Sequence, residues 1–292
     1  MRDVLGRKGN GTGVSKRERL PKFIVWSAAI LVSAVFFLIL SNIVWHGIGQ
    51  ISWEFITSAP ENAGRAGGIG PILVSTGLIL GVSVAVALPI GLGTAILLSE
   101  FTRRDSIFGR MVRRSLDILA GVPSIVFGLF GFVFFSNLLG LGFSILSGGL
   151  TLACMVLPIL IRSTEEGFRS APGEYRMSAE ALGLSKTTTI FRILLPAAAP
   201  GLAVGLILGI GRAMAETAAL LYTSGYVDRM PTSLLDSGRA LSTHIFDLSM
   251  NVAGGNDKAY ASALVLVSVL VVINIISFYI ANNWLRRRIM TI

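Results

Sequence analysis

The sequence predicts an all-α polytopic membrane protein with six transmembrane helices. Hydrophobic residues make up 53% of its 292 residues and charged residues only 14%, whereas soluble domains carry about a quarter charged residues. Six apolar stretches approach the roughly 20 residues that an α-helix needs to cross a bilayer. The basic residues behind the net charge of +9 cluster between these stretches. This pattern is typical of a membrane protein and does not indicate nucleic-acid binding.

The six spans are expected at residues 23–44, 72–98, 118–135, 143–161, 202–222 and 261–280. Residues 1–21 are basic and rich in glycine, so we expect a disordered cytoplasmic leader. Residues 22–69 hold the first span, a retained helix too long for a signal peptide, and an outer loop. The third span contains Gly121 and Pro123, so it is expected to be irregular and shielded from lipid.

The distribution of Lys and Arg predicts the orientation of these spans. Twenty basic residues lie before the first span, after the second and fourth, and in the tail, whereas four lie on the opposite side. Cytoplasmic loops carry the excess of basic residues. Both termini are therefore expected in the cytoplasm.

Glycines four residues apart occur in two spans and indicate close helix packing. The second span has Gly77 and Gly81, and the fifth has Gly201, Gly205 and Gly209. Small residues at this spacing let membrane helices approach each other. We therefore predict helix contacts at both places.

The remaining residue types give no sign of a catalytic or metal site. Cys154 is the single cysteine, which excludes an internal disulfide and a cysteine metal cluster. His46 and His244 lack histidine or carboxylate neighbours at ligand spacing, and both are interpreted as interfacial polar residues. A P-loop for ATP, a Ser/His/Asp set and paired catalytic carboxylates are also missing from the sequence. No catalytic residue, metal or bound cofactor is predicted.

The cytoplasmic loop of about residues 162–196 is long and mixes acidic with basic residues. Its pattern predicts a helix over Tyr175–Leu182, a stop at Gly183 and a second amphipathic stretch from Lys186 to Leu195, before Pro196. A helix, a glycine and a second helix on the membrane surface suit the docking of a partner protein. A solvated connector remains the alternative.

Arg212 and Glu216 are the only charges expected to be buried within a span. Charges at mid-membrane cost roughly 2.5–3.5 kcal/mol on insertion scales, so they face a polar pathway or a partner. On a helix the two would share a face and pair. Arg212 is interpreted as a donor to an oxyanion in a substrate pathway with Glu216 and Thr217. The alternative is a structural ion pair.

The loop resembles the cytoplasmic "EAA" loop of bacterial ABC importer permeases. Gly183 is followed by Ile193 and Pro196 at the family's spacing, while Met177 stands where the family has glutamate. The resemblance implies a type I permease fold over residues 70–292 and a loop that docks in the ATPase. The residues implied in this coupling are Met177, Ser178, Ala179, Glu180, Ala181, Leu182, Gly183, Leu184, Ile193 and Pro196.

Further stretches are similar to the phosphate importer's permeases, more to the PstA type than to the PstC type. They are residues 67–70 (GGIG), 121–130 (GVPSIVFGLF), 162–166 (RSTEE) and 211–218 (GRAMAETA). The resemblance implies an inner-membrane permease that forms half of a phosphate pathway. It implies a PstC-type permease, a PstB-type ATPase dimer carrying ATP and Mg, and an extracytoplasmic PstS-type binding protein docking on residues 225–260.

Two other function classes remain open from the residues. A secondary transporter or channel for a small anion would show inverted repeats, and no half-to-half similarity is evident. A membrane-embedded enzyme lacks a catalytic set. Within the ABC class, phosphonate, sulfate or molybdate is the alternative substrate.

Overall fold

The computed structural model describes residues 16–103 and 105–289. The described chain forms a first unit that ends at Trp45 and a helical body that starts at His46. Helix α1 spans Lys16–Gly47 and contains the first predicted transmembrane span. Residues 1–15 of the predicted disordered leader lie outside the described residues, and for residues 16–21 that prediction is wrong because they are helical.

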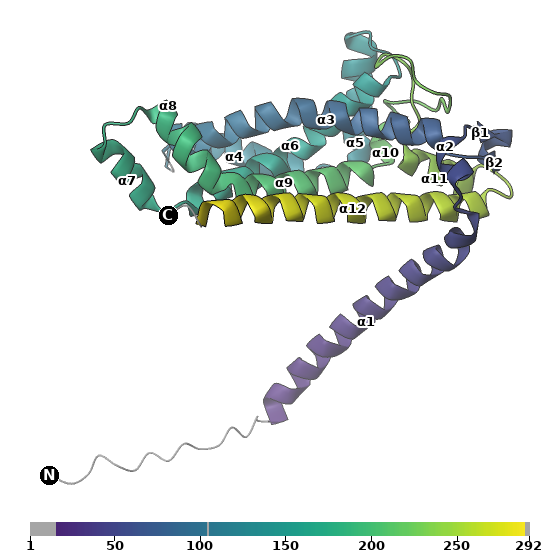
Figure 1. Ribbon diagram of the computed structural model, residues 1–292, viewed down its shortest axis with the longest axis horizontal. Helices are drawn as coiled ribbons and strands as arrows, with labels where there is room; N and C mark the ends of the chain where they lie inside the picture. The colour runs from purple at the N-terminus through teal and green to yellow at the C-terminus, as the bar shows by residue number, and fades with distance from the viewer. Residues whose placement is uncertain (1–15, 104, 290–292) are drawn as a thin grey trace. The chain divides into compact units, whose positions relative to one another are not determined.

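The helical body contains all the other elements, shown in Figure 1. Their bounds are η1 Ile48–Gln50, α2 Trp53–Thr57, β1 Pro60–Glu61, η2 Asn62–Gly64, β2 Ala66–Gly67, α3 Gly70–Ile96, η3 Leu97–Phe101, α4 Ile107–Ala120, α5 Ser124–Gly131, η4 Phe132–Leu138, α6 Ile145–Ser170, α7 Gly173–Ala181, α8 Lys186–Thr189, η5 Ile190–Leu194, α9 Leu195–Met214, α10 Ala218–Leu221, α11 Leu241–Met250 and α12 Asn256–Ile289. The strands β1 and β2 form a two-residue antiparallel ladder that pairs Pro60 with Gly67.

Five described helices are long and apolar enough to cross a membrane, and the count reaches six when the bent pair at residues 107–138 is taken as one span. Four of them belong to the body: α3, α6, α9 and α12 run along a common direction (Figure 1). Helices α7 and α8 lie at one end of this bundle, and α2, α11 and β1 lie at the other. The all-α transmembrane architecture is confirmed.

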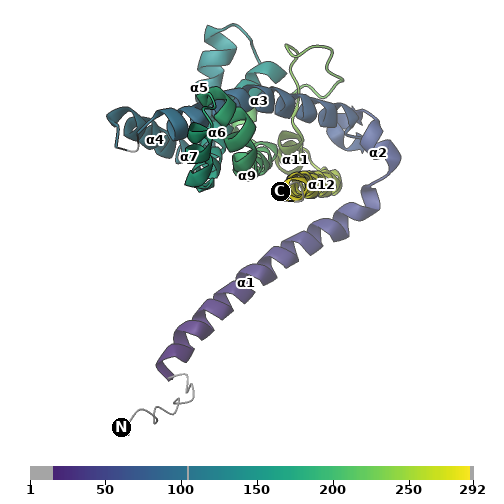
Figure 2. The same ribbon diagram turned by 60° about the vertical axis from the view of Figure 1, so that its left-hand side comes forward.

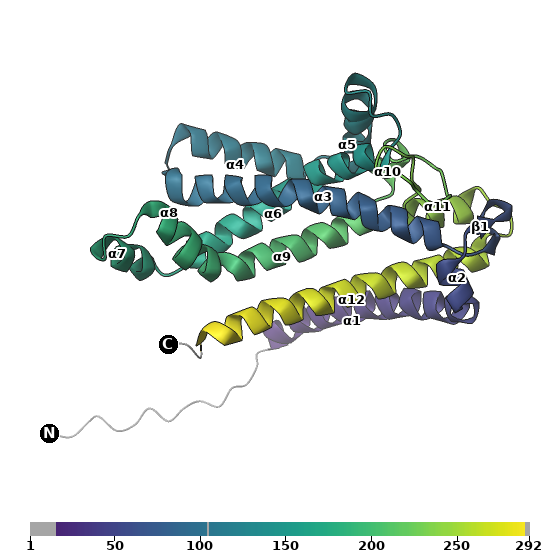
Figure 3. The ribbon, with the colours of Figure 1, turned by 45° about the horizontal axis from the view of Figure 1, so that its top comes forward.

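The third predicted span is broken, and its predicted bounds are wrong. Helix α4 ends at Ala120, and α5 begins at Ser124 after a bend of 102° (Figures 2 and 3). Pro123 has no backbone N–H and favours an extended conformation in the residue before it. The expected irregularity at Gly121 and Pro123 is therefore confirmed. The amphipathic α4, with Arg110 and Arg114, replaces the expected start of an apolar helix.

Helix α6 forms the centre of the body and packs against α3 on one side and α9 on the other. The largest cluster of buried side chains combines Ile79 of α3, Phe127 of α5, Leu152 of α6 and Ala213 of α9. Small residues bring α6 and α9 together. A Cβ added at Gly201 would lie 2.6 Å from Gly167 Cα. This contact confirms the packing predicted for the fifth span.

The same prediction is wrong for the second span. Gly77 and Gly81 are exposed on α3, and a Cβ added at either would meet no atom within 4 Å. The spacing of these two glycines therefore makes no helix contact within the described chain.

Candidate coupling and substrate-path sites

The predicted docking loop is a helix–glycine–helix segment, α7 and α8, between α6 and α9. Helix α6 continues to Ser170, so the loop starts about nine residues later than the expected Arg162. Gly183 has φ +67°, a left-handed conformation that favours glycine. The N–H of Leu184 returns to the carbonyl of Ala179 at 3.0 Å and ends α7. The predicted stop at Gly183 is confirmed.

The tip of this segment exposes apolar side chains. Met177 is 63% exposed and Leu182 is 75% exposed, while Ala179 is buried. Of the remaining expected coupling residues, those on the exposed tip are Ser178, Glu180, Ala181, Gly183 and Leu184. Ile193 in η5 and Pro196 in the first turn of α9 lie deeper and are half-buried. Most of the expected coupling residues are therefore exposed on the tip, and the last two lie at its base.

A charged cluster that sequence reasoning missed joins α4 to α6. Glu165 is buried and accepts from Arg113 of α4 at 2.9 Å and from Arg169 at 2.6 Å. Arg162 pairs with Asp117 and donates to the carbonyl of Arg113 at 3.2 Å. The expectation that the fifth span holds the only buried charges is therefore wrong. Its one sequence signal was the i, i+4 spacing of Glu165 and Arg169.

A second ion pair joins α7 to the end of α3. The guanidinium of Arg176 donates to both carboxylate oxygens of Glu100, at 2.6 and 3.1 Å. Hydrogen bonding to Glu100 raises the pKa of Arg176. These residues are 76 positions apart in the chain, so no local pattern indicates the contact.

The fifth span ends earlier than expected, between Arg212 and Glu216. Helix α9 ends at Met214, and α10 begins only at Ala218. The carboxylate of Glu216 accepts from the N–H of Ala219 at 3.1 Å, and its backbone carbonyl accepts from Ser242 at 2.5 Å. The predicted ion pair between Arg212 and Glu216 does not form in this structure.

Arg212 instead lies half-buried in the last turn of α9. Within residues 16–103 and 105–289, no hydrogen bond or ion pair engages its guanidinium. Thr217 lies half-buried in the same break. The three expected pathway residues are therefore close in the chain, but Glu216 holds the backbone of the break and leaves the Arg212 donors unused.

At the end of the body opposite the α7–α8 tip, Arg239 stabilises the connection between α10 and α11. It donates to the carbonyl of Tyr226 at 2.9 Å and lies 3.3 Å from Asp247 and 3.8 Å from Asp228. The ring Nδ1 of His244 lies 3.5 Å from the same guanidinium. His244 is buried among the residues of this connection. Burial, with Arg239 adding to it, lowers the pKa of His244 to about 4.

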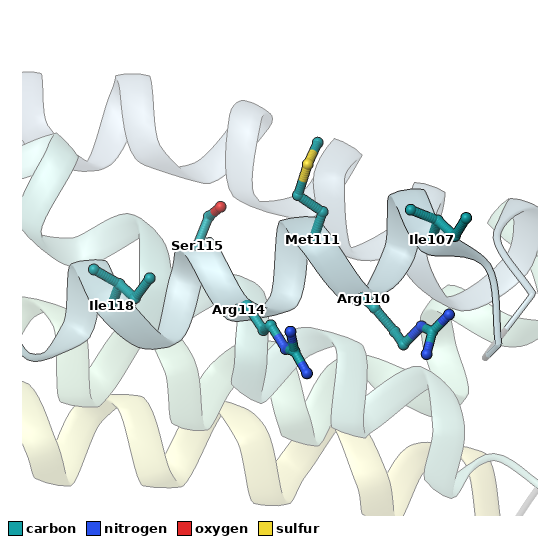
Figure 4. Close-up of a pocket in the computed structure, with 6 residues that line it drawn as sticks. All are labelled: Ile107, Arg110, Met111, Arg114, Ser115 and Ile118. Carbon is teal, nitrogen blue, oxygen red and sulfur yellow. The ribbon is translucent and has the colours of Figure 1, made fainter.

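Helix α4 presents a mixed face along an open hollow of about 510 Å³. Figure 4 shows Arg110 and Arg114 extending from one side of the helix and Met111 from the other. Ile107 is 78% exposed and Ile118 is 69% exposed. The apolar residues Ile107, Met111 and Ile118 recur at helical spacing, and the first two lie before the start of the predicted third span.

The comparisons with known proteins agree with this architecture. A solved bacterial ABC transporter involved in the import of the acidic polysaccharide alginate matches with a TM-score of 0.61 at 17% identity. The match covers 91% of this chain and 99% of that one, and it shows the fold. The body therefore has the type I ABC importer permease fold.

Sequence relatives extend over most of the chain. The "Probable ABC transporter permease protein YqgI" of Bacillus subtilis (strain 168) is 30% identical over 88% of this chain and 90% of its own. "Phosphate transport system permease protein PstA 2" of Mycobacterium tuberculosis (strain CDC 1551 / Oshkosh) is 30% identical over 94% and 92%. A family model matches residues 87–291. The chain belongs to the family described as binding-protein-dependent transport system inner membrane component.

Proposed function

We propose that this chain is the PstA-type permease subunit of an ABC importer for inorganic phosphate. The observation that carries the proposal is the exposed tip of α7 and α8, rooted between α6 and α9 within the region that matches the permease family. The similarity to a PstA protein over 94% of the chain supports phosphate as the substrate. The chain is a transport subunit, and it moves its substrate with energy supplied by a partner.

In this proposal ATP hydrolysis takes place on a separate PstB-type ATPase dimer, which binds the ATP and Mg. The tip docks in that ATPase through Met177, Leu182 and Leu184, whose exposed apolar surface favours burial against another protein. Met177 takes the place of the family's glutamate, so apolar contact replaces a charge contact there. Ile193 of η5 and Pro196 of α9 support the tip from its base.

Arg212 is the proposed phosphate contact within the span. Its planar guanidinium presents paired donors that match two oxygens of an oxyanion. Glu216 and Thr217 shape the break beside it, where the backbone of span five leaves its helix. Irregular backbone at membrane depth occurs where it lines a cavity or lies within protein. The break therefore suits a substrate pathway.

The remaining partners follow from the same proposal. A PstC-type permease completes the pathway, and a PstS-type binding protein docks outside on residues 225–260. Charged residues suited to that contact are Asp228, Arg229 and Asp236, whereas Arg239 and Asp247 are paired within the connection itself. Both termini and the α7–α8 tip face the cytoplasm of a bacterial cell, in line with the excess of Lys and Arg on that side.

Reconstitution of the complex tests this function. The chain, its partner permease and the ATPase are purified together, and ATPase activity is measured with the binding protein loaded with phosphate, sulfate, molybdate or phosphonate. We expect the ATPase to co-purify and phosphate to stimulate it most. Stimulation by another oxyanion in place of phosphate would overturn the substrate. Transport by the purified chain without ATP would instead support a secondary transporter.

The role of Arg212 is tested in the same system. Arg212→Gln removes the cation and is expected to lower phosphate uptake at least about ten-fold, as for a lost hydrogen bond to a charged group. Arg103→Gln, which changes an exposed arginine in the loop after η3, is the matched control. Uptake at the wild-type rate in an assembled Arg212→Gln complex would remove Arg212 from the pathway.

A further inference from the structure

Arg176 of α7 connects three helical segments through hydrogen bonds. Arg176 makes the two bonds to Glu100, and it also donates to the carbonyl of Phe168 at 2.9 Å and to that of Ala171 at 3.4 Å. One guanidinium therefore forms hydrogen bonds with the end of α3, the end of α6 and Ala171, which lies between α6 and α7. The Glu100 side chain is only 7% exposed, so its pairing with Arg176 is far less screened by water than a surface pair.

A second contact reinforces the first from α8. The ammonium of Lys186 lies 4.0 Å from the centre of the Phe101 ring, a distance at which a cation is attracted to an aromatic face. Glu100 and Phe101 are the last two residues of η3, a wide π-helical turn that closes α3. Both helices of the coupling tip therefore hold the same turn of α3.

Chain connectivity alone links the tip only to α6 and α9, the two helices that flank it. Helix α3 is covalently remote, but it packs along α6. Without the contacts at η3, a displacement of the tip would reach α3 only through side-chain packing. With the contacts at η3, a displacement of the tip acts directly on α3 as well as on α6 and α9.

We infer that Glu100 and Arg176 are a positioning pair that transmits movement of the α7–α8 tip to α3. The inference rests on the proposed function, because it takes the tip as the surface that the ATPase moves. In this inference the pair acts by holding the tip and α3 together, since the Glu100 carboxylate is buried away from the exposed tip. Its loss uncouples hydrolysis from transport while docking is retained.

The test measures phosphate transported per ATP hydrolysed by the complete complex in liposomes. Glu100→Gln and Arg176→Gln are each expected to leave the ATPase bound and to lower this ratio about five-fold or more, the usual range for coupling between sites. The double variant is expected to fall no further than either single one, because residues that act as a unit are not additive. Glu174→Gln, an exposed carboxylate on the same helix, is the matched control and keeps the wild-type ratio.

A wild-type ratio in either single variant would overturn the inference, as would effects that add in the double variant. Uptake and bound ATPase that fall together would show a merely structural role and also overturn it. If a glutamine variant fails to assemble, the Arg176→Lys variant tests the inference instead. It keeps the positive charge but cannot form the bidentate pair with Glu100. A lowered ratio supports the link and an unchanged ratio overturns it. Failure of the proposed function is distinct, because the wild-type complex would then show no phosphate-coupled hydrolysis.

Discussion

The two ends of the helical body both carry buried arginine ion pairs, but these pairs connect different parts of the chain. At the α7–α8 end, Arg113 joins α4 to Glu165 of α6, and Arg176 joins α7 to Glu100 after α3. At the α11 end, every partner of Arg239 lies within residues 226–247. The first end ties separate spans together, whereas the second holds the shape of one connection. Arginine ion pairs therefore join separate helices at one end and hold a single connection in shape at the other.

Among the proposed variants, loss of the Glu165 charge is expected to lower the stability of the protein most. Glu165→Gln leaves Arg113 and Arg169 close together without a counter-charge, and breaking a buried pair costs about 3–5 kcal/mol. The midpoint of thermal unfolding of the purified complex measures the loss. Glu166→Gln, an exposed carboxylate one position later, is the control and should be neutral. Equal midpoints for the two variants would contradict the role of Glu165 as a tie between α4 and α6.

Acid should weaken the α11 end through His244. Its pKa in the folded protein is about 4 against an ordinary value of 6.5, so the unfolded chain binds the proton first. Stability is complete above about pH 6.5 and falls between 6.5 and 4, by up to about 3 kcal/mol. Unfolding midpoints over this range check the effect. His244→Gln should flatten the curve, and His46→Gln should not. If the loss of stability between pH 6.5 and 4 persists in the His244→Gln variant, another titrating group causes it.

The seam between α6 and α9, which runs between the two ends, should tolerate no added methyl group. Gly201→Ala places a Cβ 2.6 Å from Gly167 Cα, and overpacking of this kind costs about 1–3 kcal/mol. Gly77→Ala, where a Cβ meets no atom within 4 Å, serves as the control. Thermal unfolding of both variants gives the comparison. A Gly201→Ala protein as stable as Gly77→Ala would mean that the two helices separate easily.

The smallest effect is expected at the exposed pair of Arg162 and Asp117. Their side chains are 41% and 64% exposed, and water-exposed pairs contribute about 0.2–1 kcal/mol. Asp117→Asn should therefore shift the unfolding midpoint only slightly, and added salt should shrink the difference further. A loss as large as that of Glu165→Gln would show that the α4–α6 tie depends on both pairs equally.

The spans and the coupling tip were predictable because their signals are local. Apolar length predicted α1, α3, α6 and α12, and Gly183 with its flanking pattern predicted the helix–glycine–helix tip. The end of α9 was not predictable from the sequence, because Ala215, Glu216 and Thr217 include neither glycine nor proline. Tertiary contacts end that helix there, including the bond from Ser242 to the Glu216 carbonyl.

The charged clusters could not be predicted for a related reason. Positive-inside counting treats Arg113, Arg169 and Arg176 as equivalent solvated charges. Their partners Glu100 and Glu165 are chosen by helix packing, and only the pair within α6 leaves a spacing in the sequence. Pairs that join separate helices are set by the fold.

The 102° bend between α4 and α5 leaves a third span that is too short to cross a bilayer without its neighbours. The eight residues of α5 and the seven of η4 reach about 22 Å at 1.5 Å per residue, short of the roughly 30 Å of hydrocarbon. A segment of this length does not insert stably alone while its bend exposes backbone to lipid. The stable placement of residues 107–138 in a bilayer therefore depends on the contacts that α5 makes with α6 and α10.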